Sequence, residues 1–259
     1  MNATTSRSRE FRHDPGPPLT VTLDLPGCVR ARLTDPVLSR ETVTELGRAL
    51  TEAEATAGIR TFVIESTGAA FCTGMPLTGG RTPSDVLEGV AQARGLLTGL
   101  ARSPLVTVAV VDGRVTGGGV ALAGACDQVI VGSSATFRIT ELLVGLLPAI
   151  LLPVVARRVG EHRAFTWALT AARLDARTAT ASGLADRMAE DTEAELRSLL
   201  REQQRTDPAA VRALKRYRDQ IRRPESVTEE LALCAFGERL ADPAARSRLN
   251  LLAEQGLLP

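Results

Sequence analysis

The chain has few aromatic residues and almost no excess of either charge. Aromatic residues make up 3% of its 259 residues, and 31 basic side chains stand against 30 acidic ones, which leaves a net charge of +1. Binding of nucleic acid needs a basic surface, and single strands also need aromatic side chains on which bases stack. The composition is that of an ordinary globular protein, and we expect no nucleic-acid partner.

Long apolar runs and closely spaced cysteines are missing as well. No apolar run reaches the length of about 18 residues expected of a membrane span, and residues 1–18 lack the apolar segment of a secretory signal. The cysteines never form a Cys-x-x-Cys pair; they are Cys28, Cys72, Cys126 and Cys234. This spacing argues against a zinc site and against a disulfide framework. We therefore expect a cytoplasmic protein with no metal and no membrane partner.

The common catalytic motifs are also absent. The chain has two histidines, His13 in a polar N-terminal segment and His162 at an expected helix start, and neither is expected to act as a base. The sequence contains no Gly-x-Ser-x-Gly, no His-Glu-x-x-His and no Walker A motif. The run Gly117-Gly118-Gly119 does not fit the Gly-x-Gly-x-x-Gly pattern of dinucleotide sites, so no nucleotide cofactor is expected.

Alternating strand and helix patterns predict an α/β fold. Pro26-Gly27 separates two strand-like runs and indicates a hairpin, and the nearly all-apolar run 105–111 indicates a strand buried on both faces. From Pro148 onward the pattern is mainly helical. The expected strands are 19–25, 28–33, 61–65, 105–111 and 128–131, and the expected helices begin at Ser39 and Ser84. We divide the chain into a flexible tail (1–18), a core (19–190) and a helical C-terminal region (191–259).

Three features carry possible chemistry. Phe71–Met75 reads FCTGM and follows a strand, Gly117-Gly118-Gly119 opens a helix, and Glu141 lies among Ile, Leu and Val. Glycines permit turns that leave backbone N–H groups exposed, and two such groups aimed at one point form an oxyanion hole. An apolar environment raises the pKa of a glutamate toward that of a working base.

Each feature also has a purely structural interpretation. The segment Phe71–Met75 could be a simple turn, the glycine run could allow close helix packing, and Glu141 could cap a helix N-terminus. Cys72 is expected to be a buried, unreactive residue. The three features together, in this order, are more specific than any one of them.

At these residues the chain resembles the crotonase (enoyl-CoA hydratase/isomerase) superfamily. The resemblance covers about residues 61–188 and rests on the segments FVIESTGAAFCTGMPL, SPLVTVAVVDGRVTGGGVALAGACDQVIVGSSATFRITELLVGLLPA and VGEHRAFTWALTAARLDARTATASGLADRM. It implies a ββα spiral with a helical C-terminal oligomerisation region, a homotrimer or hexamer, and a thioester substrate. It also implies an oxyanion hole made by the N–H groups of Met75 and Gly118, with Glu141 as the base at the α-carbon.

Two departures from the family pattern narrow the expected reaction. Hydratases of the family carry a second glutamate where this chain has Ala121, and an acidic residue is common where Pro76 stands. The segments ELLVGLLPAILLPVVARRVG, FCTGM and LKRYRDQI are similar to the dehydratase member of the polyketide β-branching enzymes. This resemblance implies dehydration of a 3-hydroxy-3-methylglutaryl group to a 3-methylglutaconyl group on an acyl carrier protein.

Other activities remain open at this stage. An enoyl-thioester isomerase needs one glutamate, a decarboxylase of the same superfamily is a further alternative, and a non-catalytic subunit could bind the carrier protein. The substrate would arrive as a phosphopantetheine or CoA thioester, with no separate cofactor. Its distal carboxylate calls for a guanidinium, for which Arg81, Arg94 and Arg114 are candidates.

Overall fold

The computed structural model describes residues 17–78, 81–221 and 226–256. His13 and most of the expected tail (1–18) lie outside these ranges. Pro17 and Pro18 are described, and their carbonyl oxygens accept hydrogen bonds from the side chain and the backbone N–H of Thr34. In the part of the chain that the structure describes, no helix combines the length and the apolar character needed to cross a bilayer.

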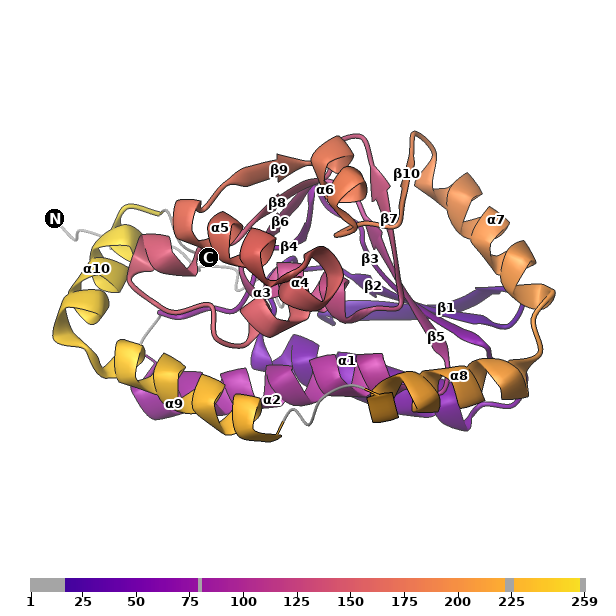
Figure 1. Cartoon of the computed structure of the whole chain (residues 1–259), viewed down its shortest axis with the longest axis horizontal. Coiled ribbons are helices and arrows are strands. Elements are labelled where there is room, and N and C mark those ends of the chain that lie inside the picture. The colour runs from indigo at the N-terminus through magenta and orange to yellow at the C-terminus, as the bar shows by residue number, and fades with distance from the viewer. Residues whose placement is uncertain (1–16, 79–80, 222–225, 257–259) are drawn as a thin grey trace, which may run out of the picture.

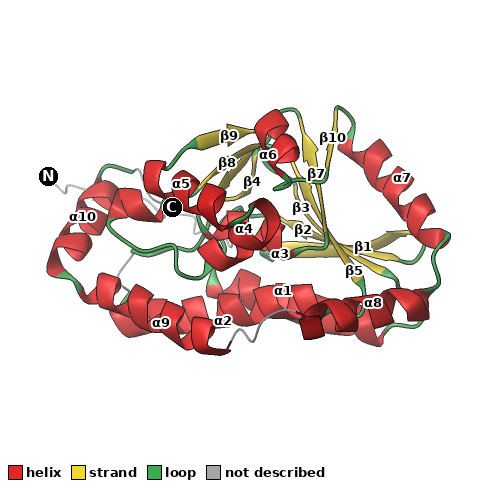
Figure 2. Ribbon diagram, in the orientation of Figure 1, coloured by secondary structure: helices red, strands yellow, loops and turns green. Residues whose placement is uncertain are grey.

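Two β-sheets form the scaffold (Figures 1 and 2). Within the described residues, one sheet has the order β1-β2-β3-β5-β7-β10 and the other the order β4-β6-β8-β9. The strands are β1 (Leu19–Leu25), β2 (Cys28–Leu33), β3 (Thr61–Ser66), β4 (Ala70–Cys72), β5 (Val106–Val111), β6 (Arg114–Thr116), β7 (Gln128–Gly132), β8 (Thr136–Arg138), β9 (Arg173–Asp175) and β10 (Arg187–Ala189).

Helices surround these sheets and make up most of the chain after β8. They are α1 (Arg40–Ala55), α2 (Pro83–Arg102), α3 (Gly118–Ala125), the 3₁₀ helix η1 (Glu141–Val144), α4 (Leu151–Val159), α5 (Glu161–Thr170), α6 (Ala176–Ser182), α7 (Thr192–Gln204), α8 (Pro208–Ile221), α9 (Ser226–Ala241) and α10 (Pro243–Glu254). Figure 1 shows α8 and α9 along the same side of the molecule as α1 and α2, with α7 near β7 and β10.

The chain winds as a spiral in which each turn contributes one strand to each sheet. β3, β5 and β7 lie parallel and adjacent in the larger sheet, while β4, β6 and β8 follow them in the smaller one. α2 follows β4, and α3 follows β6. This winding is the ββα spiral that the sequence resemblance implied, and the expected α/β fold class is confirmed.

The expected hairpin and the buried strand are both present. β1 and β2 pair antiparallel around Gly27, whose φ of 68° suits glycine. In β5, Val108 and Val110 pack with the apolar face of α7, whereas Ala109 and Val111 join the main core on the other side of the sheet. A parallel strand covered on both faces needs this unbroken apolar run.

One sequence-based expectation needs correction. α2 begins at Pro83, and its N-cap is Thr82 rather than Ser84. The Thr82 hydroxyl accepts from the Asp85 N–H, the Asp85 carboxylate accepts from the Thr82 N–H, and proline suits the first helical position. The region after Pro148 is mainly helical, as expected, and β9 and β10 add short strands at the sheet edges.

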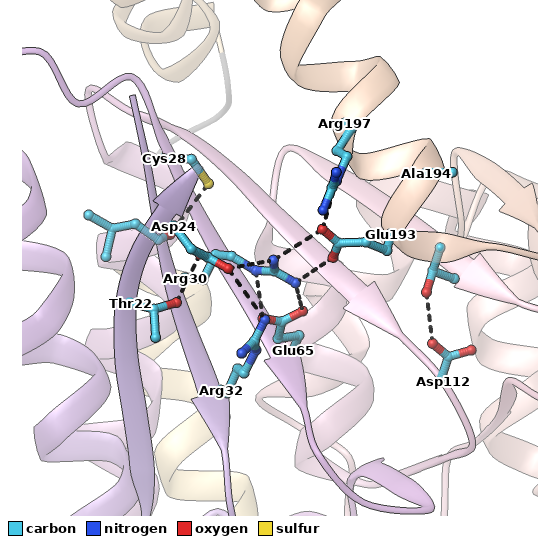
Figure 3. Close-up of polar contacts among 12 residues, drawn as sticks. Thr22, Asp24, Cys28, Arg30, Arg32, Glu65, Asp112, Glu193, Ala194 and Arg197 are labelled. Carbon is cyan, nitrogen blue, oxygen red and sulfur yellow. Dashed lines mark hydrogen bonds and ion pairs between the residues drawn. The ribbon is translucent and has the colours of Figure 1, made fainter. Parts of the chain in front are cut away.

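A buried ion-pair cluster ties α7 to the larger sheet (Figure 3). Arg30 of β2 donates to both carboxylate oxygens of Glu65 at 2.8 Å and to Glu193 of α7 at 2.6 Å. Arg32 also donates to Glu65, at 2.6 Å. Although burial acts to lower it, hydrogen bonds to Glu65 and Glu193 raise the pKa of Arg30 above its usual range. The cluster holds α7 against the larger sheet, whose face under α7 is otherwise apolar.

Candidate active site

Two main-chain segments meet at the start of α3. The Leu38 N–H donates to the Gly74 carbonyl at 2.9 Å, and the Thr116 hydroxyl donates to the Thr73 carbonyl at 2.9 Å. Gly74 has a φ of 91°, and a Cβ placed on it would lie 3.1 Å from the nitrogen of Gly118. Only glycine allows this approach, which holds the segment after β4 directly against the first turn of α3.

Two backbone N–H groups beside this junction have no acceptor within the described residues. Gly118 is the first residue of α3, and its N-cap, Gly117, offers no side chain to cover the helix start. Among the described residues, the N–H groups of Met75 and Gly118 have no hydrogen-bond acceptor, and both residues line the same pocket. Two unpaired amides are suited to an oxygen that gains negative charge, and the dipole of α3 reinforces the one at Gly118.

Glu141 reaches the same pocket from η1, which follows β8. Its Oε2 accepts from the Thr140 N–H at 2.9 Å, and its Oε1 would lie 3.3 Å from a Cβ placed on Gly117. Burial raises the pKa of Glu141 to about 7, although backbone hydrogen bonds from residues 141 and 140 act to lower it. A carboxyl group with this pKa can accept and return a proton near neutral pH.

The pocket itself is almost entirely apolar. It has a volume of about 110 Å³, and of the described side chains that line it only that of Glu141 is ionisable. The apolar lining residues come from α2, α3, η1, α4 and α9, from the segment before α1 and from the connections between elements; they include Leu38, Val90, Leu97, Val144, Ile150, Leu151 and Phe236. An acyl chain would therefore be bound mainly by contact with hydrocarbon side chains.

The structure thus brings Met75, Gly118 and Glu141 together around one pocket. Ala121, where hydratases of the family carry a second glutamate, also lines it and is buried. An oxyanion hole stabilises an enolate, and a single base next to it can remove a proton from the α-carbon of a thioester. The arrangement is suited to this chemistry.

Several other candidate residues do not line the pocket. Arg81 is exposed and donates to the Thr78 carbonyl at 2.9 Å, Arg114 is exposed on β6, and Arg94 lies on α2. His162 is exposed in the first turn of α5. Among the described residues, no arginine lines the pocket.

Cys72 and Lys215 are buried residues outside the pocket. Cys72 is fully buried, and burial raises the pKa of its thiol to about 12, which keeps the thiol protonated. Lys215 is buried in α8, where its ammonium donates to the Asp127 carboxylate and to the Leu105 carbonyl. Neither side chain is among those that line the pocket. In the described ranges, no three His, Cys, Asp or Glu side chains gather as metal ligands.

Phe236 and Thr140 are among the pocket residues that the sequence analysis missed. Phe236 comes from α9, far along the chain, and no local pattern marks it as part of the pocket. Thr140 directly precedes Glu141 and lines the pocket beside it. A polar residue next to a candidate base in an apolar stretch is a signal that could have identified Thr140.

Known proteins similar to this chain come from one family. The family model described as enoyl-CoA hydratase/isomerase matches residues 27–236. The bacillaene synthase dehydratase PksH of Bacillus subtilis is 29% identical over 160 residues, which cover 62% of this chain and 62% of PksH. A Thermus thermophilus protein named as an enoyl-CoA hydratase is 32% identical over 185 residues, covering 69% of this chain and 73% of that protein.

Solved structures show the same fold. A crystal structure described as the polyketide biosynthesis enoyl-CoA hydratase of Bacillus subtilis has a TM-score of 0.83 at 22% identity, covering 93% of this chain and 98% of that chain. An enoyl-CoA hydratase/isomerase from Mycobacterium paratuberculosis has a TM-score of 0.82 at 23% identity, covering 93% and 100%. With the family model matching most of its length, the chain belongs to the enoyl-CoA hydratase/isomerase family, the crotonases.

Proposed function

We propose that this enoyl-CoA hydratase-like protein is a lyase that removes water from a 3-hydroxyacyl thioester. The observation that carries the proposal is the placement of one carboxyl group, Glu141, beside the free N–H groups of Met75 and Gly118 in an apolar pocket. An elimination that passes through an enolate requires these elements: a base for the α-proton and donors for the thioester oxygen.

The reaction proceeds in two steps. The Glu141 carboxylate takes the proton from the α-carbon, and the electron pair moves to the thioester oxygen, which accepts hydrogen bonds from Met75 and Gly118. The enolate then collapses, the bond between the β-carbon and its oxygen breaks, and the double bond forms. The departing oxygen takes the proton held by Glu141 and leaves as water. Each oxyanion donor contributes about 3 kcal/mol by comparison with measured oxyanion holes.

The substrate class follows from the resemblance and the named relatives. PksH is named as a dehydratase of a polyketide synthase, and the position of the second hydratase glutamate holds Ala121. We propose 3-hydroxy-3-methylglutaryl on the phosphopantetheine arm of an acyl carrier protein as the substrate and 3-methylglutaconyl as the product. Because no described arginine lines the pocket, an uncharged 3-hydroxy-3-methylacyl chain is a second candidate substrate.

A single proton-carrying carboxyl group also suits an enoyl-thioester isomerase. Such an enzyme moves a proton from the α-carbon to the γ-carbon without water, and Glu141 could carry it. This second function is favoured by the fact that no other ionisable side chain lines the described pocket.

Mass spectrometry of carrier-bound acyl groups, with NMR spectroscopy of the released acyl group to locate its double bond, distinguishes these functions. The purified protein is incubated with acyl carrier protein loaded with 3-hydroxy-3-methylglutaryl, with its uncharged analogue, or with 3-methylglutaconyl, and with the same groups on CoA. Loss of one water from a hydroxyacyl group supports the proposed lyase. Migration of the double bond without water loss supports the isomerase, and loss of carbon dioxide from 3-methylglutaconyl shows a decarboxylase. No change in any acyl group, with the carrier still bound, contradicts an enzymatic role.

A further inference from the structure

The Thr140 side chain lies next to the Glu141 carboxyl group at the wall of the pocket. A Cβ placed on Gly117 would lie 3.4 Å from Thr140 Oγ1 and 3.3 Å from Glu141 Oε1. The hydroxyl and the carboxylate oxygen therefore flank the same point beside the start of α3. The Thr140 N–H also donates to Glu141 Oε2 at 2.9 Å, which holds the two residues in a defined relation.

The Thr140 hydroxyl is the uncommitted side-chain hydroxyl of this pocket. The other threonine that lines it, Thr73, donates its hydroxyl to the Pro36 carbonyl at 3.3 Å. Among the described residues, no hydrogen-bond partner is present for Thr140 Oγ1, and the hydroxyl does not cap η1. A half-buried hydroxyl at the wall of an apolar pocket, without a partner in the protein, is available to a polar atom of the bound substrate.

The substrate of the proposed reaction carries a β-oxygen for which the carboxylate and the two amides provide no dedicated hydrogen-bond donor. That oxygen must lie close to Glu141, because it takes the proton that Glu141 removed from the α-carbon. It must also be held while the enolate forms. Ala121 contributes only a methyl group to this region.

We propose that the Thr140 hydroxyl binds the β-oxygen of the substrate and steadies it as it leaves. This inference rests on the proposed function. Glu141 takes the α-proton and later gives it to the β-oxygen, while Thr140 donates a hydrogen bond to that oxygen and keeps its own proton. When the bond between the β-carbon and this oxygen breaks, water is released beside Thr140, the double bond forms, and Glu141 returns to its carboxylate state.

Two variants and two reactions test this role. Thr140→Val has nearly the same volume but lacks the hydroxyl, whereas Thr140→Ser keeps it, and Thr44→Val, on an exposed face of α1, is the control for handling and folding. Dehydration is followed on the hydroxyacyl substrate. Exchange of the α-proton with solvent deuterium is followed on the saturated analogue that lacks the β-hydroxyl, and this exchange needs only Glu141 and the two amides.

We expect Thr140→Val to lower the kcat of dehydration by about 10- to 100-fold, since one hydrogen bond to a departing oxygen is lost. Its α-proton exchange stays within about twofold of wild type, and Thr140→Ser restores most of the dehydration rate. Dehydration by Thr140→Val at the wild-type rate overturns the inference, and so does an equal loss of exchange and dehydration. Failure of the wild-type protein in both reactions overturns the proposed function itself.

Discussion

At the scale of single residues, one carboxyl group determines the expected pH dependence. Burial raises the pKa of Glu141 to about 7, and only the ionised form can take a proton from carbon. We predict that kcat/KM falls about tenfold per pH unit below pH 7 and reaches a plateau above it. The measurement is a pH profile of dehydration. A profile that is flat down to pH 5 would mean that Glu141 is not the base.

The same pKa shift has a consequence for folding stability. The folded pKa of Glu141 lies above its usual value of 4.5, so between pH 4.5 and 7 the folded chain holds a proton that the unfolded chain releases. The free energy of unfolding therefore falls as the pH rises through this range, and the loss is complete above pH 7. Glu141→Gln does not suffer this loss.

We therefore predict that the stability advantage of Glu141→Gln over wild type grows by about 3 kcal/mol from pH 4.5 to pH 8. Urea unfolding of both proteins at the two pH values measures it, and all other titrating groups are shared by the two chains. An advantage that does not change with pH would show that the carboxyl group is not buried as described.

At the scale of structural elements, the start of α3 depends on close contact with β4. A Cβ at Gly119 would collide with the Cys72 carbonyl, whereas a Cβ at Gly95 in α2 would meet nothing within 4 Å. Gly119→Ala should therefore destabilise the protein by about 3 kcal/mol. Gly95→Ala should stabilise it by about 0.5–1 kcal/mol, because alanine favours helix. Thermal unfolding of both variants measures these effects, and a tolerated Gly119→Ala contradicts the packing described.

The attachment of α7 depends on Arg30. Removing this side chain in Arg30→Met leaves Glu65, which is 8% exposed, with Arg32 as its remaining cation. Leaving a buried charge short of a partner costs about 3 kcal/mol, so we predict a loss of this size in urea unfolding. Arg48→Met breaks ion pairs on an exposed face of α1 and should leave the unfolding midpoint almost unchanged. Equal effects of the two variants would contradict a buried role for Arg30.

At the scale of the whole molecule, local patterns predicted the fold better than they predicted the pocket. Some features depend only on a few neighbouring residues, so the local sequence predicts their structure. They are the Pro26-Gly27 break, the apolar run of β5 and the glycines at the start of α3. The N-cap of α2 is also local, but Thr82 and Asp85 form it together, and Ser84 alone suggested the wrong start.

Contacts between distant parts of the chain could not be predicted in this way. Arg30 and Glu193 lie 163 positions apart, and the strands β9 and β10 are three residues long and exist only as partners of existing sheet edges. The absence of arginine from the described pocket lining is likewise a property of the folded chain. The oligomerisation role of residues 191–259 stays a prediction, and α8 exposes Leu214, Tyr217 and Ile221 along one side.

The central claim is that Glu141 and two backbone amides converge on the α-carbon of a bound thioester. Exchange of the α-proton of a saturated acyl thioester with solvent deuterium, followed by mass spectrometry, tests it without any requirement for a leaving group. The account predicts steady deuterium incorporation by the wild-type protein and none above background by Glu141→Gln, with both proteins folded. Equal incorporation by the two proteins, or none by the wild type, would contradict it.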